Sequence, residues 1–443
     1  MIYNKFIEKI ILPIGDLYNR SFYINQLKYW RKVDSFSEQE LEELQNNNLK
    51  ELLINTVKNV PKYQKISLKG DDPHLWLQEF PILNKEDIRD DLDNLISITT
   101  NKKELIAYSS SGSSGIQSTV YMTKKEQSNI RAILTHWWEW SGYKIGNPII
   151  QTGISPDRGY LKSIKDILFK TIYINAFNHS EKQLERLSVK IKNRNNTFYI
   201  AGYASSLNVV SEYFLKKGLK IKLKAAISFG DKLFEVYKKN IKSAFDCDVF
   251  DNYACNEGFL IASQKDLEYK YIMSPHVYLE ILDNNNNPVP DGEIGNVVVT
   301  RLDGFSMPLI RYRIGDLAIK LPKENYPVKR AFNYPLLKKI VGRETDIIYL
   351  PNNEKMVVHS FTGIFEYITE IKQFKVIQEN INEILIEYIK TSKFTNKVLE
   401  RATIELQKHI QDKNFKINYK EVDFIPSTKS GKPQIIESKL LKK

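Results

Sequence analysis

Residues 198–231 read FYIAGYASSLNVVSEYFLKKGLKIKLKAAISFGD, and this stretch decides the fold class. It holds a short apolar run, an amphipathic segment that ends at Gly218, and a second apolar run. Further runs of the same kind, PIIQTGIS, VFDNYAC, YLEILD and NVVVTRL, follow or precede amphipathic segments. Strand, helix and strand in repetition predict an α/β fold with largely parallel and partly mixed sheets.

The two ends of the chain differ in their expected secondary structure. Residues 1–100 are mostly helical in pattern; the stretch 35–60 has apolar spacings of three and four, with Ser35 or Ser37 as the N-cap and Pro61 as its end. The turn-rich stretch NNNNPVPDGEIG (284–295) predicts a hairpin tip. After Gly342 come hairpin-like strands and two helices, HSFTGIFEYITEI and TNKVLERATIELQKHIQ. We therefore expect an N-terminal domain over 1–342 and a small α+β domain over 343–443.

Composition places the chain among folded globular proteins. Its 443 residues are 42% hydrophobic and 27% charged, which excludes collagen-like and wholly disordered chains. No run approaches the roughly 18 apolar residues that a transmembrane helix needs. Cys247 and Cys255 cannot form a disulfide framework, and residues 1–18 show no export signal. A cytoplasmic protein is the simplest expectation.

The net charge of +12 is open to two interpretations. It suits nucleic acid or an anionic membrane surface, and it equally suits a lysine-rich solvated surface. The one dense basic run, Lys216–Lys224, is typical of the polar end of a helix followed by a strand with lysines on its solvent-exposed face. The chain shows no basic tail and no interleaving of arginine with aromatic residues, so the pattern disfavours nucleic-acid binding.

Two motifs lie within the α/β region. The Ser/Gly stretch 109–115 is either a flexible linker or a loop whose backbone N–H groups cradle a polyphosphate. The apolar run before it and the β-rich run STVYMT after it favour a strand–loop–strand. The second motif, DNYACNEG (251–258), is either an ordinary strand-end turn or a site where Glu257 binds Mg²⁺ at the carboxyl end of a strand.

Three further motifs follow in order. In MPLIRYRIGD (307–316), the carboxylate of Asp316 could accept both hydroxyls of a ribose, and the arginines offer forked donors for phosphate. VGRETD (341–346) lies at the expected domain boundary. PSTKSGKP (426–433) taken alone is typical of a solvated loop tip.

The order and spacing of these five motifs, from residue 109 to residue 432, resemble the adenylate-forming superfamily. Within it, MPLIRYRIGD is similar to the phenylacetate–CoA ligase branch. The stretches WWEWSG (137–142) and PNNEK (351–355) resemble the capsular-polysaccharide (CapK-like) proteins of that branch. The resemblance covers nearly the whole chain. It implies a large N-terminal domain and a small mobile C-terminal domain that together activate a carboxylic acid with ATP.

The resemblance implies a role for each matching position. The loop over the β- and γ-phosphates would be Ser110, Ser111, Gly112, Ser113, Ser114 and Gly115. The adenine site would be lined by Ser228, Phe229, Gly230, Asp231, Asn252 and Tyr253. Glu257 would hold Mg²⁺, Asp316 the ribose diol, Arg343 and Arg313 the ribose or phosphates, and Lys432 the substrate carboxylate and α-phosphate. Cations are needed there because a carboxylate that attacks a phosphate brings two anions together.

The acceptor is left open by departures from the usual pattern. The phosphate loop continues as Ile116-Gln117-Ser118 without the usual Pro and Lys, and residues 350–354 read LPNNE in place of a Gly-rich segment that guides CoA in many relatives. The acceptor is therefore either CoA or an amine on a sugar of a surface polysaccharide.

The remaining candidates concern the acid and a second metal. Tyr203 and Ala204, with Phe229 and Ala254, lie where relatives contact the acyl group. Trp137, Trp138 and Trp140 could wall that pocket, although aromatic residues at this helical spacing more often belong to the core. Cys247, Cys255 and His276 offer a weak zinc signal without a CxxC pair. The rival prediction is a catalytically inactive basic protein on the same fold that binds nucleotide, nucleic acid or a membrane. Intact Glu257 and Lys432 argue against it.

Overall fold

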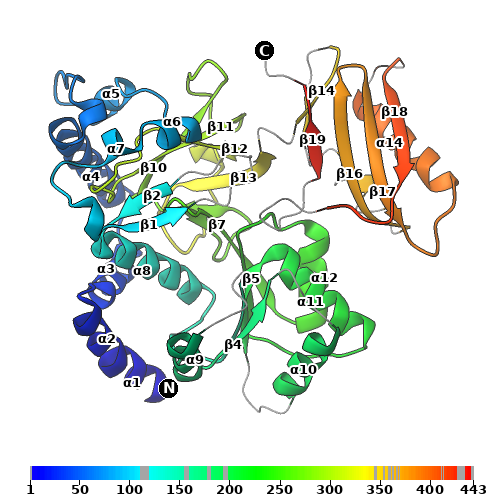
Figure 1. The fold of residues 1–443 in the computed structure, drawn as a ribbon, viewed down its shortest axis with the longest axis horizontal. Helices are drawn as coiled ribbons and strands as arrows, with labels where there is room; N and C mark the ends of the chain where they lie inside the picture. Colours follow the sequence, from blue (N-terminus) through cyan, green and yellow to red (C-terminus); the bar gives the residue numbers. More distant parts are fainter. Residues whose placement is uncertain are drawn as a thin grey trace.

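A computed structural model describes residues 2–109, 119–153, 159–176, 181–192, 198–343, 347–352, 355–357, 361, 364–365, 368, 370–410, 412, 414–426 and 435–440. Figure 1 shows a large body of helices and sheets and, beside it, a smaller body of strands and one helix near the C-terminus. Within the described residues, no helix combines the length and apolar character needed to cross a bilayer.

The first hundred residues are helical, as their apolar spacing predicts. The helices are α1 (Ile2–Phe6), α2 (Leu12–Asn19), α3 (Tyr23–Val33), α4 (Glu38–Asn59), α5 (Pro73–Gln78), α6 (Lys85–Asp90) and α7 (Leu92–Leu95), with a π-helical turn η1 (Ile7–Ile11) and 3₁₀ turns η2 (Pro61–Tyr63) and η3 (Lys102–Glu104). Ser37 precedes helix α4 as its N-cap, and the side chains of Ser37 and Glu40 form a reciprocal capping box. The helix ends at Asn59, before Pro61.

Helix α8 (Lys124–Trp140) holds the N-terminal helices through a buried polar cluster. Arg31 forms ion pairs with Glu139 of α8 and with Glu8. His136 Nε2 lies 3.0 Å from Asp34 Oδ1 and Nδ1 lies 3.6 Å from Glu139. Burial by itself lowers the pKa of His136, but the two carboxylates outweigh it and raise that pKa above its ordinary value.

The Ser/Gly motif lies between two paired strands. Strands β1 (Ile106–Ser109) and β2 (Thr119–Met122) are antiparallel, with Ser109 opposite Thr119. The prediction of a strand on each side of the loop is therefore confirmed, while residues 110–118 lie outside the described part of the chain.

One sheet of eleven strands runs through the large body, in the order β10-β11-β12-β13-β9-β8-β7-β6-β5-β3-β4. Its parallel half consists of β3 (Ile149–Gly153), β4 (Thr171–Asn175), β5 (Tyr199–Tyr203), β6 (Ala225–Phe229) and β7 (Asp248–Cys255). Helices α9 (Gly159–Leu168), α10 (Glu181–Lys192), α11 (Ala204–Lys216) and α12 (Glu235–Phe245) connect these strands. The parallel sheet predicted from residues 198–231 is confirmed.

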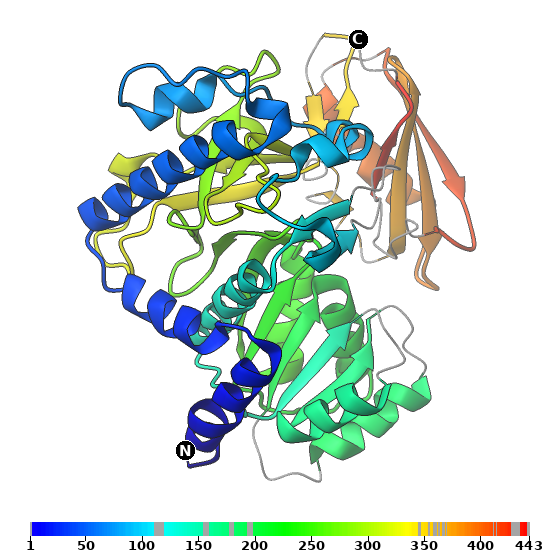
Figure 2. The ribbon, with the colours of Figure 1, turned by 60° about the vertical axis from the view of Figure 1, so that its left-hand side comes forward.

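Successive residues of the parallel strands point to opposite faces of the sheet, and each face packs into a different hydrophobic core. Ile200 and Ala226 pack with apolar residues of α10, α11 and α12 on one face. Tyr199, Ala201 and Ile227 pack with α8 on the other face. Strands covered by helices on both sides are apolar throughout, which is why the parallel strands appear in the sequence as continuous apolar runs. Figure 2 shows the helices on either side of this sheet.

The basic run before β6 differs from the prediction. Helix α11 ends at Lys216, as expected, but residues 219–224 are not part of a strand. Leu219, Ile221 and Leu223 still turn toward the core of α10–α12. The lysines thus alternate with core residues along an extended segment that enters β6, not along a paired strand.

The other half of the sheet is antiparallel. It contains β8 (Phe259–Ser263), β9 (Lys270–Ile272), β10 (Val277–Leu282), β11 (Ile294–Arg301), β12 (Tyr312–Lys320) and β13 (Leu336–Arg343), with a 3₁₀ turn η4 (Lys323–Asn325). Strands β10 and β11 pair across residues 283–293, which confirms the predicted hairpin.

The smaller body has its own core. Strands β16 (Ile371–Asn380), β17 (Glu383–Lys390), β18 (Lys416–Glu421) and β19 (Ile436–Ser438) form a sheet with helix α14 (Lys397–Ile410), beside a hairpin of β14 (Ile347–Tyr349) and β15 (Lys355–Val357). The α+β architecture is as predicted. Its core also takes in Phe234, which precedes α12 of the large body. The division at residue 342 stays a prediction.

Candidate functional site

The carboxyl ends of β5, β6 and β7 lie next to one another and carry several of the predicted site residues. Tyr203 ends β5 opposite Phe229, which ends β6, and Ser228 of β6 lies opposite Asp251 of β7. Ligands of open α/β sheets bind outside the carboxyl ends of the strands. The topology therefore gathers at one edge residues that are up to fifty positions apart in the sequence.

Close packing at this edge depends on glycine. Gly230 has φ of +83°, and a Cβ added there would lie 2.6 Å from Cε1 of Tyr203. The Tyr203 ring in turn lies 5.9 Å from the ring of Phe229. Any larger residue at position 230 would have to move this ring.

One of the three candidate tryptophans of α8 stacks on Phe229. The rings of Trp138 and Phe229 are 6.3 Å apart and nearly parallel. Trp137 is 1% exposed and packs in the core beside Trp140. Trp137 therefore belongs to the core, which is one of the two interpretations of the sequence, because successive helical residues point about 100° apart and only Trp138 faces Phe229. Ala204 is buried at the start of α11, and Ala254 packs against the same core as Phe229.

Asp231 caps the helix that follows β5. Its Oδ1 accepts a hydrogen bond from the N–H of Ala204 at 2.5 Å, and its Oδ2 accepts one from the N–H of Ser205 at 3.2 Å. The residue preceding α11, Tyr203, makes no side-chain cap, and the first turn contains no acidic residue. The carboxylate therefore supplies the anion that a helix N-terminus favours.

Ser228 and Asn252 support the strand ends from within. Ser228 Oγ donates to Oδ1 of Asp251 at 2.7 Å, and Lys270 pairs with the other oxygen of Asp251 at 2.8 Å. Asn252 accepts from Ser263 Oγ at 2.7 Å. Its buried Nδ2 has no acceptor within the described ranges, which marks a donor that remains to be satisfied.

Tyr253 connects β7 to β12. Its hydroxyl donates to Oδ2 of Asp316 at 2.9 Å, and the ring is largely buried. This bond holds the Asp316 carboxylate of β12 against Tyr253 of β7. Two motifs that are sixty residues apart in the sequence thus meet through one hydrogen bond.

Glu257 is a buried carboxylate with few partners. It is 5% exposed, accepts a hydrogen bond from Tyr312 Oη at 3.2 Å, and lies 3.9 Å from Lys85 Nζ of α6. Burial and the Glu257 charge raise the pKa of Tyr312 far above its ordinary value, so this hydroxyl remains a donor. A buried carboxylate that a cation approaches no closer than 3.9 Å is suited to receive a further positive charge.

A magnesium ion would need ligands beyond the protein here. The described residues contain no group of three or more His, Cys, Asp or Glu side chains placed to hold a metal. Mg²⁺ is commonly held by one or two carboxylates together with substrate phosphates and water. Glu257 fits that pattern as a single protein ligand.

The arginines of the Arg-Tyr-Arg motif have structural partners. Arg311, at φ of +49°, pairs with Glu280 at 2.9 Å. Arg313 donates to Oδ1 of Asn286, in the turn of the β10–β11 hairpin, at 2.7 Å. The backbone of Arg343 ends β13 opposite Asp316, and its side chain lies outside the described part.

Two predicted elements lie wholly outside the described residues. They are the phosphate loop, Ser110 to Gly115, and the C-terminal Lys432. Their roles stay predictions.

The weak zinc signal finds no support in the geometry. His276 Nδ1 donates to Asp303 at 2.5 Å while Nε2 accepts from the N–H of Leu260 at 3.3 Å, so both ring nitrogens are engaged. Burial raises the pKa of Cys247 to about 12 and raises that of Cys255 well above its ordinary value. Among the described residues, no three His, Cys, Asp or Glu side chains are placed together to hold a metal.

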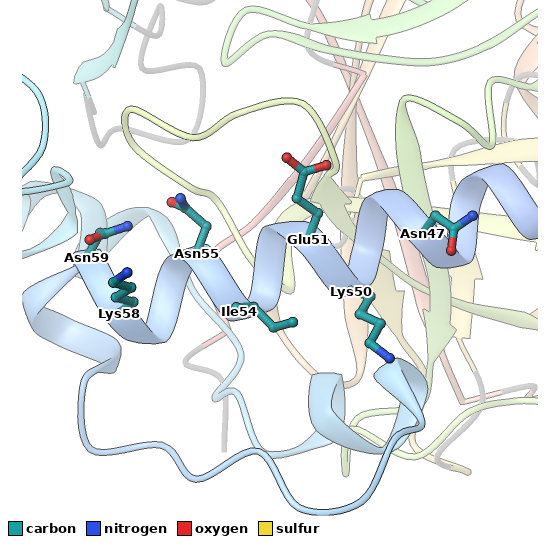
Figure 3. A pocket seen from close by; sticks show the side chains of 7 residues that line it. All are labelled: Asn47, Lys50, Glu51, Ile54, Asn55, Lys58 and Asn59. Atoms are coloured by element: carbon teal, nitrogen blue, oxygen red, sulfur yellow. The ribbon is translucent and has the colours of Figure 1, made fainter.

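A surface groove of about 510 Å³ runs along α4. Figure 3 shows that all the side chains lining it come from this one helix, and none of them is a predicted site residue. A groove without a second wall cannot enclose a ligand.

Sequence reasoning missed Lys85 and Tyr312 in the strand-end region, and it did not separate Trp138 from the neighbouring tryptophans. Lys85 gives no signal, because a lysine at the start of a surface helix is common. Tyr312 lies within a quoted motif, and its position next to two arginines could have singled it out. Trp138 could have been separated from Trp137 only by knowing which face of α8 meets the sheet.

The chain was compared with solved structures to find proteins of the same fold. The chain superposes on 2-hydroxyisobutyryl-CoA ligase in the postadenylation state with a TM-score of 0.71, covering 92% of this chain and 91% of that one at 17% identity. The chain therefore has the fold of an adenylate-forming CoA ligase, as the ordered motifs predict.

Proteins of similar sequence are more specific than the fold alone. Protein CapK of Staphylococcus aureus is 25% identical over 426 residues, covering 91% of each chain. Phenylacetate-coenzyme A ligase of Aromatoleum evansii is 26% identical over 335 residues, which is 72% of this chain and 74% of that enzyme. The family model of the CapK C-terminal domain matches residues 348–439. The homologues are thus CapK and phenylacetate–CoA ligases, which confirms the resemblance.

Proposed function

We propose that the protein activates a carboxylic acid with ATP and then transfers the acyl group to an acceptor. In the first step a carboxylate oxygen attacks the α-phosphorus of ATP, the bond from that phosphorus to the bridging oxygen of pyrophosphate breaks, and acyl-adenylate and pyrophosphate form. The observation that carries the proposal is the convergence of Tyr203, Tyr253, Glu257 and Asp316 at the carboxyl ends of β5–β7.

The nucleotide would lie over these strand ends. Asp316, held by Tyr253 at 2.9 Å, would accept the two ribose hydroxyls. Gly230 and Asp231 would face the base, and the unsatisfied amide of Asn252 would serve as a donor in the same region. Ser228 would act indirectly, because its hydroxyl is already bonded to Asp251 at 2.7 Å.

Charge would be balanced by a metal and by basic side chains. Glu257 would hold Mg²⁺ together with phosphate oxygens, and the metal would supply neutralisation of the departing pyrophosphate. The loop Ser110–Gly115 would close on the β- and γ-phosphates, and Arg313 and Arg343 would serve the ribose or phosphates. Lys432 would bridge the acid carboxylate and the α-phosphate.

The acid would lie between the end of β5 and the Phe229–Trp138 stack. Tyr203, Phe229 and Trp138 present an aromatic wall there, with Ala204 and Ala254 as small residues that leave space. An aromatic wall favours an acid with an apolar or ring-bearing body.

The small C-terminal body would act as a mobile lid over residues 343–443. It would bring Lys432 to the site for adenylation and then rotate to admit the acceptor, since one site must serve two partial reactions. The acceptor would be the thiol of CoA or an amine on a sugar. The similarity to CapK over 91% of both chains supports a role in surface polysaccharide formation.

The first experiment measures pyrophosphate release with ATP, Mg²⁺ and a panel of carboxylic acids. We expect release with at least one acid, and a loss of roughly 10²- to 10³-fold in Lys432→Ala, as for one preorganised charge in a transition state. The matched control is Lys429→Ala, a lysine three residues away, which should retain activity.

Absence of release with every acid, or a Lys432→Ala rate equal to the control, would contradict the proposal. Nucleotide binding without release would favour the inactive alternative on the same fold. The acceptor is identified by adding CoA or an amino sugar to the active pair and following the rate of AMP formation, which only the true acceptor should raise.

A further inference from the structure

The N-terminal helices carry a row of large apolar side chains that the protein does not cover. Ile2, Ile14, Leu17 and Tyr18 are 87%, 60%, 83% and 87% exposed, and Phe6 and Ile10 lie between them in the row at more than 40%. Single exposed apolar residues are ordinary, but a contiguous row marks an interaction surface. We call these six residues the N-terminal stripe.

The helix geometry keeps the stripe on one side. Residues four apart drift around an α-helix because one turn takes 3.6 residues. The π-helical turn η1, between α1 and α2, takes more than four residues per turn and reverses this drift. Phe6, Ile10 and Ile14 thereby remain in line over roughly 12 Å of the helix.

The opposite side of the same helix is fixed to the protein. Ile7 is fully buried, and Tyr3, Ile11 and Leu12 pack against the core that contains α8. Tyr3 also donates a hydrogen bond from its hydroxyl to the carbonyl of Leu168 at 2.6 Å. The stripe therefore faces outward from a helix whose position is determined by its inner face.

In residues 5–20 the basic side chains point to solvent and the acidic side chains contact the rest of the protein. Lys5, Lys9 and Arg20 are exposed. Glu8 is turned to Arg31 at 2.5 Å, and the Asp16 carboxylate accepts from Ser21 Oγ at 2.5 Å and from the backbone of the next helix. The outward charges are thus basic, and the acidic side chains are engaged with the protein.

A neighbouring helix carries exposed apolar residues of its own. Helix α9 ends at Leu168, beside Tyr3, and Figure 1 shows it next to the N-terminal end of the chain. Its residues Tyr160, Ile164 and Ile167, spaced four and three apart, are all exposed, as is Lys162. Two helices thus present apolar residues bordered by lysines in one region.

We infer that the N-terminal stripe lies in the surface of an anionic lipid bilayer. Apolar residues along one face, with aromatic members and lysines at the border, are the features of a helix that lies in the membrane interface. The outward lysines complement anionic headgroups, and their long stems allow the charge to reach the headgroups while the stripe enters the acyl boundary. The enzyme would then act at a membrane surface.

The test is co-sedimentation of the full chain with vesicles of phosphatidylcholine, with and without phosphatidylglycerol. We expect binding to the anionic vesicles that falls as salt is raised. Ile14→Glu/Leu17→Glu should weaken binding by about tenfold or more. Lys5→Glu/Lys9→Glu should weaken binding to the anionic vesicles alone.

The matched control is Ile404→Glu/Phe424→Glu, which changes two residues that are 60% and 73% exposed in the C-terminal body. It should bind as the unaltered protein does. Far-UV circular dichroism should be unchanged in every variant, because all of these positions are exposed. Equal binding of the stripe variant and the control would overturn the inference. A concentration-dependent dimer that the stripe variant abolishes, without vesicle binding, would also overturn it and assign the stripe to a second copy of the chain.

Discussion

Replacing Asp231 with alanine should weaken the junction between β6 and α11. The change removes two hydrogen bonds to the N–H groups of Ala204 and Ser205, at 2.5 and 3.2 Å, and a negative charge at the helix N-terminus. A lost cap costs about 1 kcal/mol and the lost charge about 0.3–1 kcal/mol. We expect the free energy of unfolding to fall by about 1.5–2 kcal/mol, since the first turn has no acidic residue of its own to compensate.

The assay is urea unfolding followed by far-UV circular dichroism. Asp231→Ala should shift the midpoint to lower urea without changing the slope. Asp231→Asn keeps one acceptor oxygen but no charge, so its loss should be about half as large. The control is Asp71→Ala, an exposed aspartate, which should stay within about 0.5 kcal/mol of the unaltered protein.

Equal midpoints for Asp231→Ala and Asp71→Ala would refute the reasoning. That result would mean that water or another group satisfies the helix N-terminus as well as the carboxylate does. An unfolding loss for Asp231→Asn as large as for alanine would assign the effect to charge alone, against the hydrogen-bond part of the argument.

Three further changes have definite expected outcomes. Gly230→Ala should destabilise more than Gly218→Ala in urea unfolding: both have positive φ, +83° and +64°, but only the first added Cβ meets the Tyr203 ring. The raised pKa of His136 makes its contribution complete below pH about 6.5 and lost as pH rises through the folded-state pKa, so His136→Gln should flatten the fall in unfolding free energy there. Tyr312→Phe removes a donor from a buried carboxylate and should lower the free energy of unfolding by about 1.5–3 kcal/mol.

Each of these has a contrary result that can be measured directly. Equal losses for the two glycine variants would mean that backbone strain alone decides the effect. A His136→Gln protein with the same pH slope as the unaltered one would place the titrating group elsewhere. A neutral Tyr312→Phe would show that Glu257 is sufficiently hydrated without the hydroxyl.

The sequence predicted those parts of the fold that depend on local periodicity. The parallel strands, the hairpin tip within 284–295 and an N-cap at Ser37, one of the two serines predicted, all follow from residues close together in the chain. The lysine run 216–224 shows where this reasoning ends. Its alternation correctly places Leu219, Ile221 and Leu223 inward, but whether an extended segment becomes a strand depends on partners that lie elsewhere in the chain.

The site could be predicted as a set of residues but not as an arrangement. Spacing singled out Glu257, Tyr253 and Asp316, and the structure brings the last two into contact at 2.9 Å. It could not show that Lys85 lies 3.9 Å from Glu257, because their positions are 172 residues apart in the chain and meet only through the packing of α6. Helical spacing likewise could not separate Trp137 from Trp138.

Phe234 joins the two bodies of the protein in a way that makes their separation sensitive to temperature. Its ring is 8% exposed and belongs to the core of the C-terminal sheet, although the residue precedes α12. A rotation that parts the two bodies must expose this ring to water. Exposure of apolar surface raises the heat capacity, and the attraction that opposes it weakens on cooling. In the proposed lid motion, the contribution of this contact to the closed arrangement would therefore weaken on cooling.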